Sequence, residues 1–405
     1  MLSASTMKIS QKLLWVVGNP LKLRFRVPTF IVKKFRVPTL ICDKFAIPRI
    51  RQIEPLDTLA VFALALYLVF TFVLFFSWVE PSLRGTGPWR IGADSGTYQD
   101  IADVFSDDSV LLSPTQNLLG PVLLAIWLKS SFLIALFNTG LLVVSLLMLT
   151  RTRVWAFLFW LLWNPLTFSA LTTLNKEIFA LLSAVSFWRW LQHKRWSWLC
   201  IALLSSCFTR WEQFVVIILF LSMLRIRHRG VAVISLLIVL SAACYLGGQF
   251  LVSDYPTEAQ SAVTDALTWA SLRGFYFLVF PIRLLVALTS QVMQFWVPFL
   301  DTRRFYDMQT GMFLLGNQLC MCLMLFLLWL KSLLTLSNDA SYFLAIFAVT
   351  YCAAPLNQPR YFYFCYVFAA MMLADTSPDS RRASVPIHPA QLAALPCAPG
   401  GLLSP

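Results

Sequence analysis

The sequence predicts an all-α, polytopic membrane protein with about ten transmembrane helices and with both termini in the cytoplasm. Hydrophobic residues make up 59% of the 405 residues, whereas charged residues make up only 13%. The hydrophobic residues fall into runs of roughly 18 to 24 residues, about the length of a helix that crosses a ~30 Å hydrocarbon core. These runs lack the period-two alternation of membrane barrel strands, so the pattern excludes that class of membrane protein.

The N-terminal segment 1–55 is strongly basic and is expected to form a cytoplasmic arm. It holds eleven of the 32 lysines and arginines, and it repeats Phe-Arg-Val-Pro-Thr at 25–29 and 35–39, with Phe-Ala-Ile-Pro at 45–48. Prolines at this spacing prevent a continuous helix. The charge therefore indicates an extended arm on the anionic lipid leaflet rather than a nucleic-acid partner, although the composition equally fits a disordered tail. No signal peptide is expected, because the first long apolar run begins near Leu56.

The first span is expected at 56–78, and the basic arm before it places the loop 79–130 on the outer face by the positive-inside rule. Two stretches of this first outer loop are expected to lie as helices on the outer surface: the amphipathic stretch 98–105 and the run 121–128, which is too short to span. A group of aspartates in the loop fits a solvated face, namely Asp100, Asp103, Asp107 and Asp108.

The remaining spans follow from apolar runs separated by basic clusters. They are expected at 131–150, 154–172, 178–191, 197–209, 213–224, 231–251, 312–332, 340–356 and 361–375. A second long outer segment is expected at 252–311. Within it, the apolar stretch 275–299 is interrupted by Pro281, Arg283 and Pro298, which favours an outer-face or re-entrant element over a further span.

These runs define one transmembrane domain, 56–375, followed by a Pro-rich tail, 376–405, that is expected to be disordered in the cytoplasm. Seven of the nine cysteines lie inside apolar runs and the other two lie in the tails, so neither a disulfide framework nor a metal site is expected. No cofactor is predicted. A divalent cation lacks support, because one exposed carboxylate is a poor metal site by itself.

Ionisable side chains at membrane depth are costly and call for an explanation. On the expected topology, five segments present such side chains at the outer helix ends. They contain Asp94, the triplet Asn175-Lys176-Glu177, Arg210 with Glu212, Arg283, and Arg360 with Tyr361. We expect these side chains to line one outer cavity.

Three of these positions have both a chemical and a structural interpretation. Asp94 lies in a glycine-flanked loop, where a carboxylate can take a proton from a hydroxyl; alternatively, Asp94 or Ser95 caps the following helix. Glu177 either serves the site or is simply favoured by the helix dipole. Lys176 opposes that dipole, which a bound phosphate would explain.

The two outer arginines also allow two interpretations each. Arg210 lies between two short apolar runs, and it either points into the cavity or is neutralised by Glu212. Arg360 follows Pro359 at the start of the last span, and it is suited to bidentate phosphate recognition. With Tyr361, it would otherwise belong to an interfacial belt of Arg and Tyr.

This arrangement resembles the GT-C superfamily of multi-spanning glycosyltransferases, which use polyprenyl-phosphate-linked sugars as donors, and it is similar to the bacterial polysaccharide polymerases. The resemblance covers roughly 56–375 and is carried by the acid in the first outer loop, the surface helices after it, the polar triplet and the late Arg-Tyr pair. Many members have a paired acid or a large outer C-terminal domain. Neither is evident in this sequence, which leaves the subfamily open.

The resemblance implies roles for individual residues. Asp94 would be the base, Glu177 would orient the acceptor, and Lys176, Arg210 and Arg360 would hold the lipid phosphate. Asn175, Tyr98 and Tyr361 would contact the substrate. It also implies a glycan or lipid-linked acceptor and a bacterial inner (plasma) membrane. Two alternatives remain: a non-catalytic subunit of a polysaccharide assembly system, for which Asp94 is dispensable, and a lipid-linked glycan transporter, which predicts internal repeats that the spans lack.

Overall fold

The computed structural model describes residues 55–79, 98, 119–149, 152–207, 209–251, 262–296, 308–353 and 359–375. In these residues every regular element is a helix, and one isolated bridge joins Thr152 to Asp375. The all-α prediction is therefore confirmed for this part of the chain. The chain divides into the units Met1–Ile53 and Glu54–Pro405, and the helices described below belong to the second unit. The predicted arm up to residue 54 and the predicted tail 376–405 lie outside the described residues.

Within the part of the chain that the structure describes, three helical stretches are long and apolar enough to cross a membrane. They are Thr58–Ser77, Arg229–Gly247 and Ala266–Thr289. The first belongs to α2 (Pro55–Leu74) and η2 (Phe75–Val79), the second to α12 (Arg229–Leu251), and the third to α13 (Ala262–Ala270), η5 (Ser271–Phe275) and α14 (Tyr276–Trp296). A fourth appears if the bent pair α7 (Val154–Trp163) and α8 (Pro165–Thr172) counts as one span. The chain is thus compatible with a membrane protein, and the number of ten spans stays a prediction.

The other helices are shorter or carry more polar residues. They are α5 (Leu119–Leu128), α6 (Ser131–Leu147), α9 (Glu177–His193), α10 (Trp196–Cys207), α11 (Trp211–Met223), α15 (Met308–Leu330), α16 (Asp339–Ala353) and α17 (Tyr363–Ala374), with the 3-10 turn η8 (Pro359–Phe362) before the last. A helix of about twelve residues is only ~18 Å long. Such helices are shorter than the ~30 Å hydrocarbon core, so the residues that flank them would also have to lie inside it.

The stretch 275–299, expected as an outer-face or re-entrant element, is helical up to Trp296 in the described residues, and whether it spans stays a prediction. The helix α14 continues through Pro281, and the combined stretch Ala266–Thr289 meets the length and composition of a span. The surroundings of Arg283 explain why its charge is tolerated in this apolar stretch. Its side chain is buried, and it donates a 2.8 Å hydrogen bond to Ser271 Oγ. The cation is therefore satisfied inside the protein rather than facing lipid.

The sharp bend between α7 and α8 results from the pair Asn164-Pro165. The two helices meet at 85°. The side chain of Asn164 accepts a hydrogen bond from Leu166 N at 2.9 Å and so caps α8, and Pro165 starts the new helix, where its missing N–H costs nothing. The buried amide of Asn164 also donates to Asn317 Oδ1 of α15 at 2.8 Å. This bend interrupts the predicted span 154–172 and brings the chain to the start of α9.

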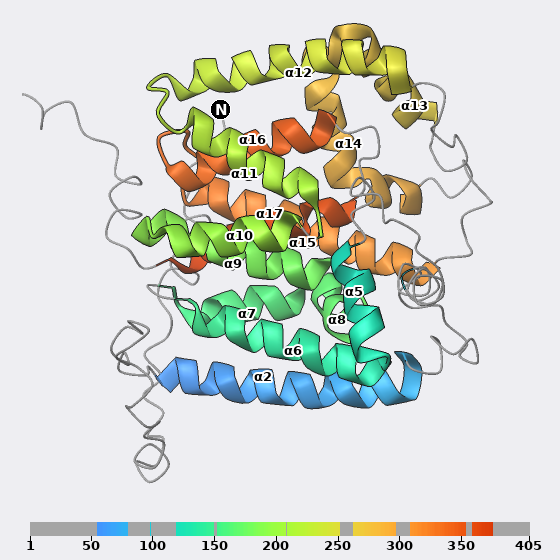
Figure 1. The fold of residues 1–405 in the computed structure, drawn as a ribbon, viewed down its shortest axis with the longest axis vertical. Coiled ribbons are helices and arrows are strands. Elements are labelled where there is room, and N and C mark those ends of the chain that lie inside the picture. Colours follow the sequence, from blue (N-terminus) through green and yellow to red (C-terminus); the bar gives the residue numbers. More distant parts are fainter. Residues whose placement is uncertain are drawn as a thin grey trace, which may run out of the picture. The chain divides into compact units, whose positions relative to one another are not determined.

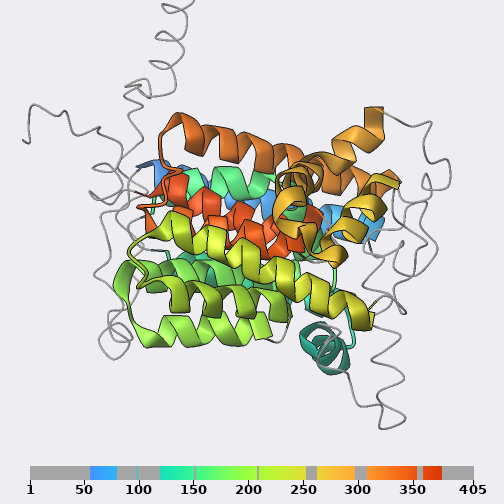
Figure 2. The same ribbon diagram turned by 90° about the horizontal axis from the view of Figure 1, so that it is seen from above.

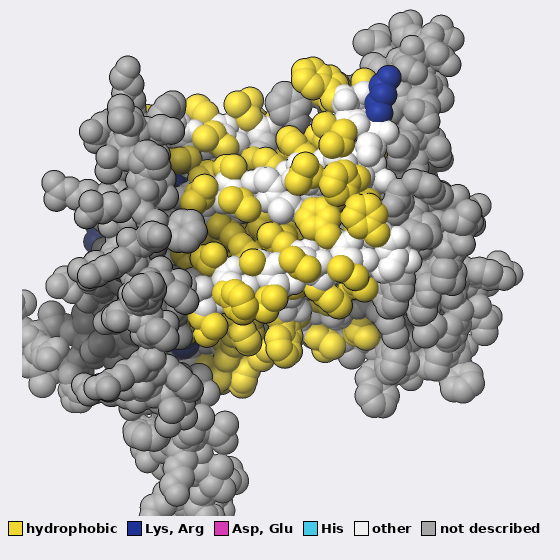
Figure 3. All heavy atoms as spheres, turned by 90° about the horizontal axis from the view of Figure 1, so that it is seen from below, with side chains coloured by type: hydrophobic (Ala, Val, Ile, Leu, Met, Phe, Trp, Pro, Cys, Tyr) yellow, Lys and Arg dark blue, Asp and Glu magenta, His cyan; other side chains and the backbone are white. Residues whose placement is uncertain are grey.

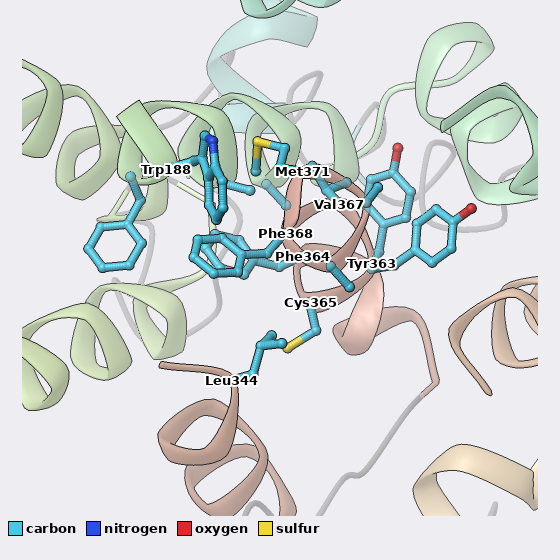
Figure 4. Packing of buried hydrophobic residues seen from close by; sticks show 14 of the residues in the cluster. Trp188, Leu344, Tyr363, Phe364, Cys365, Val367, Phe368 and Met371 are labelled. Carbon is cyan, nitrogen blue, oxygen red and sulfur yellow. The ribbon is translucent and has the colours of Figure 1, made fainter. Parts of the chain in front are cut away.

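Helix α17 lies at the centre of the described core. All its side chains except Leu373 are buried, as expected for a helix that is hydrophobic on every side. Figure 4 shows Phe368 beside Trp188 of α9, with ring centroids 5.2 Å apart, and Cys365 pointing toward Leu344 of α16. Large aromatic residues thus hold α9, α16 and α17 together.

The outer helices expose apolar side chains instead of burying them. On α2, Leu59, Phe62 and Leu66 are each more than half exposed. Figure 3 shows hydrophobic side chains covering the middle of the α2 face, with Lys and Arg visible only toward its edges. Soluble monomers rarely expose an apolar patch of this extent, whereas lipid accommodates it.

Helices α10, α11, α12 and α16 run alongside one another, so their connections fall at two ends (Figures 1 and 2). We define the basic end by the connections 194–195, 224–228 and 331–338. There Asp339 pairs with Lys194 at 3.5 Å and with Arg229 at 2.5 Å. The opposite end contains the starts of α9 and α11 and the end of α16, and we call it the site end. Which end faces the cytoplasm stays a prediction.

Candidate functional site

A buried ion pair joins two helix starts at the site end. Arg210 Nη2 lies 2.6 Å from Glu177 Oε1, and the two side chains are only 5% and 1% exposed. Glu177 is the first residue of α9, and Arg210 is the N-cap of α11. The chain reaches Arg210 through a turn in which Arg210 N donates to Ser206 O at 2.7 Å. The sequence allowed Glu212 as the neutralising partner, whereas the structure gives Arg210 the carboxylate of Glu177.

The pair keeps Arg210 charged despite its burial. Burial lowers the pKa of Arg210, the neighbouring Glu177 carboxylate raises it, and the net direction is upward. A buried ion pair stabilises a fold only when its remaining hydrogen-bonding capacity is also satisfied. The hydrogen bonds around the pair therefore decide whether it is purely structural.

Arg360 and Tyr361 of η8 complete one side of the cluster. The guanidinium carbon of Arg210 lies 4.6 Å from the centroid of the Tyr361 ring, and that of Arg360 lies 5.8 Å from the same centroid. Two cations thus share one aromatic ring, an arrangement stabilised by the quadrupole of that ring. The ring of Tyr351, at the end of α16, lies 6.2 Å from that of Tyr361.

Lys176 and Tyr98 form a second contact, one residue before Glu177. The ammonium of Lys176 lies 5.5 Å from the centroid of the Tyr98 ring. Tyr98 is buried in a small cluster with Val122 of α5 and Leu174. Asn175 faces its own neighbour, because its Oδ1 accepts a hydrogen bond from Lys176 N at 2.7 Å. Lys176 therefore opens α9 beside an aromatic ring and a carboxylate.

Several buried polar atoms at this end have no hydrogen-bond partner among the described residues. They are Glu177 Oε2, both amide atoms of Gln213, and the hydroxyl of Tyr351. Gln213 lies one turn after Arg210 on the buried side of α11. Buried polar groups are normally hydrogen-bonded, so the lack of a partner at each of these atoms needs an explanation. Gln213 and Tyr351 were not among the predicted site residues, although a glutamine inside an apolar run is itself a signal.

The predicted site residues are thus only partly placed. The structure brings together Glu177, Arg210, Arg360 and Tyr361, with Lys176 and Tyr98 adjoining through α9. Asp94, the predicted base, lies outside the described residues. Arg283 donates to Ser271 and lies near Tyr276, Cys352 and Cys244, and its place in the common cavity stays a prediction.

Chemically, the cluster offers cations held in place by aromatic rings, one carboxylate and several open hydrogen-bonding groups. This combination suits a polar, anionic ligand. No group of three or more His, Cys, Asp or Glu side chains within the described ranges is arranged to hold a metal ion. Comparisons with protein-family models, with curated proteins and with solved structures found no match for this chain.

Proposed function

We propose that the chain is an integral membrane glycosyltransferase that transfers a sugar or oligosaccharide from a polyprenyl-phosphate-type donor to an acceptor on the outer face of the membrane. The proposal includes about ten spans, cytoplasmic termini and a bacterial inner membrane. The observation that carries it is the cluster at the site end, where Arg210 and Arg360 flank Tyr361 and Glu177 keeps an open carboxylate oxygen.

The arginines would hold the phosphate of the donor. Glu177 accepts a hydrogen bond from one nitrogen of the Arg210 guanidinium. This bond fixes the orientation of the Arg210 side chain and leaves its other N–H groups for a ligand. Arg360 and Lys176 would add charge from two other segments. Such donors are most valuable where the negative charge grows during the reaction, which is on the phosphate as it leaves.

The chemical step would be a displacement at the anomeric carbon. The acceptor hydroxyl gives its proton to a base, for which we propose Asp94, and its oxygen forms the new glycosidic bond. The bond between the anomeric carbon and the phosphate oxygen breaks, and the electron pair leaves with the lipid phosphate. Glu177 Oε2 and the amide of Gln213 are groups that would orient the acceptor.

The test is product formation in cells carrying Arg210→Gln, Arg360→Gln or both, with Arg227→Gln as the control. Arg227 is an exposed arginine at the basic end, so the control removes the same charge away from the cluster. Loss of the glycan product in the site variants alone, at equal membrane levels, supports the proposal. Unchanged product in the double variant contradicts it and favours a non-catalytic subunit of a polysaccharide system or a transporter.

A further inference from the structure

A second feature of the fold is an apolar cavity that the site end does not use. It has a volume of about 230 Å³ and lies between α14, α15, α16 and the start of α17. Its inner wall contains Met321, Phe362 and Cys365, which are all buried. Figure 4 shows one part of this wall, where Cys365 of α17 meets Leu344 of α16.

The opposite wall reaches the surface at the basic end. Leu334 and Leu336 line the cavity and are each 39% exposed. Both belong to the connection 331–338. Exposure therefore increases from the inner wall to these leucines, which mark the mouth of the cavity.

The lining selects hydrocarbon rather than a soluble ligand. A cavity of about 150 Å³ lined by aliphatic and aromatic side chains stays dry and takes up benzene. The cavity described here is larger, and only Thr335 and Ser341 add hydroxyls to its lining. The hydroxyl of Ser341 already donates to Leu333 O at 2.5 Å. The small side chains of Ala345 and Ala348 leave room along α16.

Cationic side chains lie near the mouth, and one of them, Arg229, is paired with Asp339 at 2.5 Å. Lys331 is exposed, three residues before Leu334, and its side chain has no ion-pair partner among the described residues. Arg153, the exposed N-cap residue of α7, is a second cation close enough to interact with Lys331. Arg229 also fixes the backbone of the connection 331–338 at the mouth, because it donates hydrogen bonds to Leu336 O at 2.9 Å and to Ser337 O at 2.8 Å.

We infer that this cavity holds one hydrocarbon chain of an anionic membrane lipid, whose headgroup phosphate lies against Lys331 at the basic end. The apolar lining accounts for the chain, and the unpaired cation at the mouth accounts for the negative headgroup. This lipid site rests on the chain lying in a membrane and is independent of the proposed transferase activity.

The experiment is native mass spectrometry of the full chain, purified in detergent and titrated with phosphatidylglycerol or phosphatidylcholine. Ala345→Trp fills the cavity. Each buried methylene is worth roughly fourfold in affinity, so displacing two methylenes lowers retention of phosphatidylglycerol by about fifteenfold. Lys331→Gln is expected to reduce the retention of phosphatidylglycerol and to leave the retention of phosphatidylcholine unchanged. The matched control is Ala242→Trp, which changes an exposed alanine in a different apolar hollow between α12 and α14.

A further variant guards against misfolding of Ala345→Trp. Leu336→Glu places a negative charge at the exposed mouth, and it should reduce the retention of phosphatidylglycerol without altering the thermal midpoint. The inference is overturned if Ala345→Trp and Leu336→Glu, both folded, retain phosphatidylglycerol like the wild type. It is also overturned if inorganic phosphate alone competes as well as the lipid, because the cavity would then have no part in binding.

Discussion

Replacing Arg210 with methionine removes the cation from a buried ion pair and leaves the Glu177 carboxylate without its partner. The two side chains are 5% and 1% exposed, so water compensates the remaining charge poorly. Breaking a buried pair by removing one member costs about 3–5 kcal/mol in the free energy of unfolding. We therefore expect Arg210→Met to be among the most destabilising single changes at the site end.

The comparison variants separate burial from charge. Lys194→Met removes a partner of Asp339 from a pair whose side chains are 51% and 38% exposed, and such surface pairs are worth only about 0–1 kcal/mol. The double variant Arg210→Met/Glu177→Leu removes both buried charges, and it is expected to recover most of the loss, since an apolar pair of similar volume is often neutral.

The assay is reversible unfolding in mixed micelles, followed by tryptophan fluorescence for the wild type and the variants. The coupling between Arg210 and Glu177 follows from the double-mutant cycle. The reasoning is refuted if Arg210→Met costs no more than Lys194→Met, or if the double variant is as unstable as the sum of the two single variants.

Three other positions give sharp expectations. Gly316→Ala places a Cβ 2.6 Å from Pro165 Cγ, so it is expected to destabilise the fold by about 1–3 kcal/mol. Gly140→Ala meets nothing within 4 Å, so it should not destabilise the protein in the same micelle unfolding assay. Asn138→Ala removes the hydrogen bonds to Thr173 O at 2.9 Å and Leu171 O at 3.4 Å, at the end of α8, and a loss of about 1–3 kcal/mol is expected; a change below measurement error would contradict it. Gln213→Leu removes a buried amide without a partner among the described residues and should stabilise the protein by about 1 kcal/mol while reducing product. Stabilisation with full product would exclude Gln213 from the site.

The sequence was sufficient to predict the helical class and the positions of most helices, because long apolar runs and basic clusters carry that information locally. It did not predict the partner of Arg210. Glu177 and Glu212 are both acidic and both stand in the first turn of a helix. Choosing between them requires knowing that α9 and α11 start at the same end, which is a property of tertiary packing.

Two other features depended on contacts that no local pattern contains. Arg283 reads as a charge that interrupts a span, yet Ser271 accepts its hydrogen bond within the same helical stretch. The bend at Asn164 divides a predicted span, and Asn317, far along the chain, stabilises it. The position of Gln213 in an apolar run is a signal in the sequence, but the burial of Gln213 and Tyr351 without a partner among the described residues is visible only in three dimensions.

The most direct test of the proposed transferase is the amount of glycan or lipid-linked product in cells carrying Asp94→Asn beside cells carrying the wild type, with membrane levels of both proteins measured. This change keeps the size of the side chain and removes the carboxylate that would accept the proton. The account predicts loss of product at a normal protein level. Unchanged product would contradict the assignment of Asp94 as the base and would favour a non-catalytic subunit or a transporter.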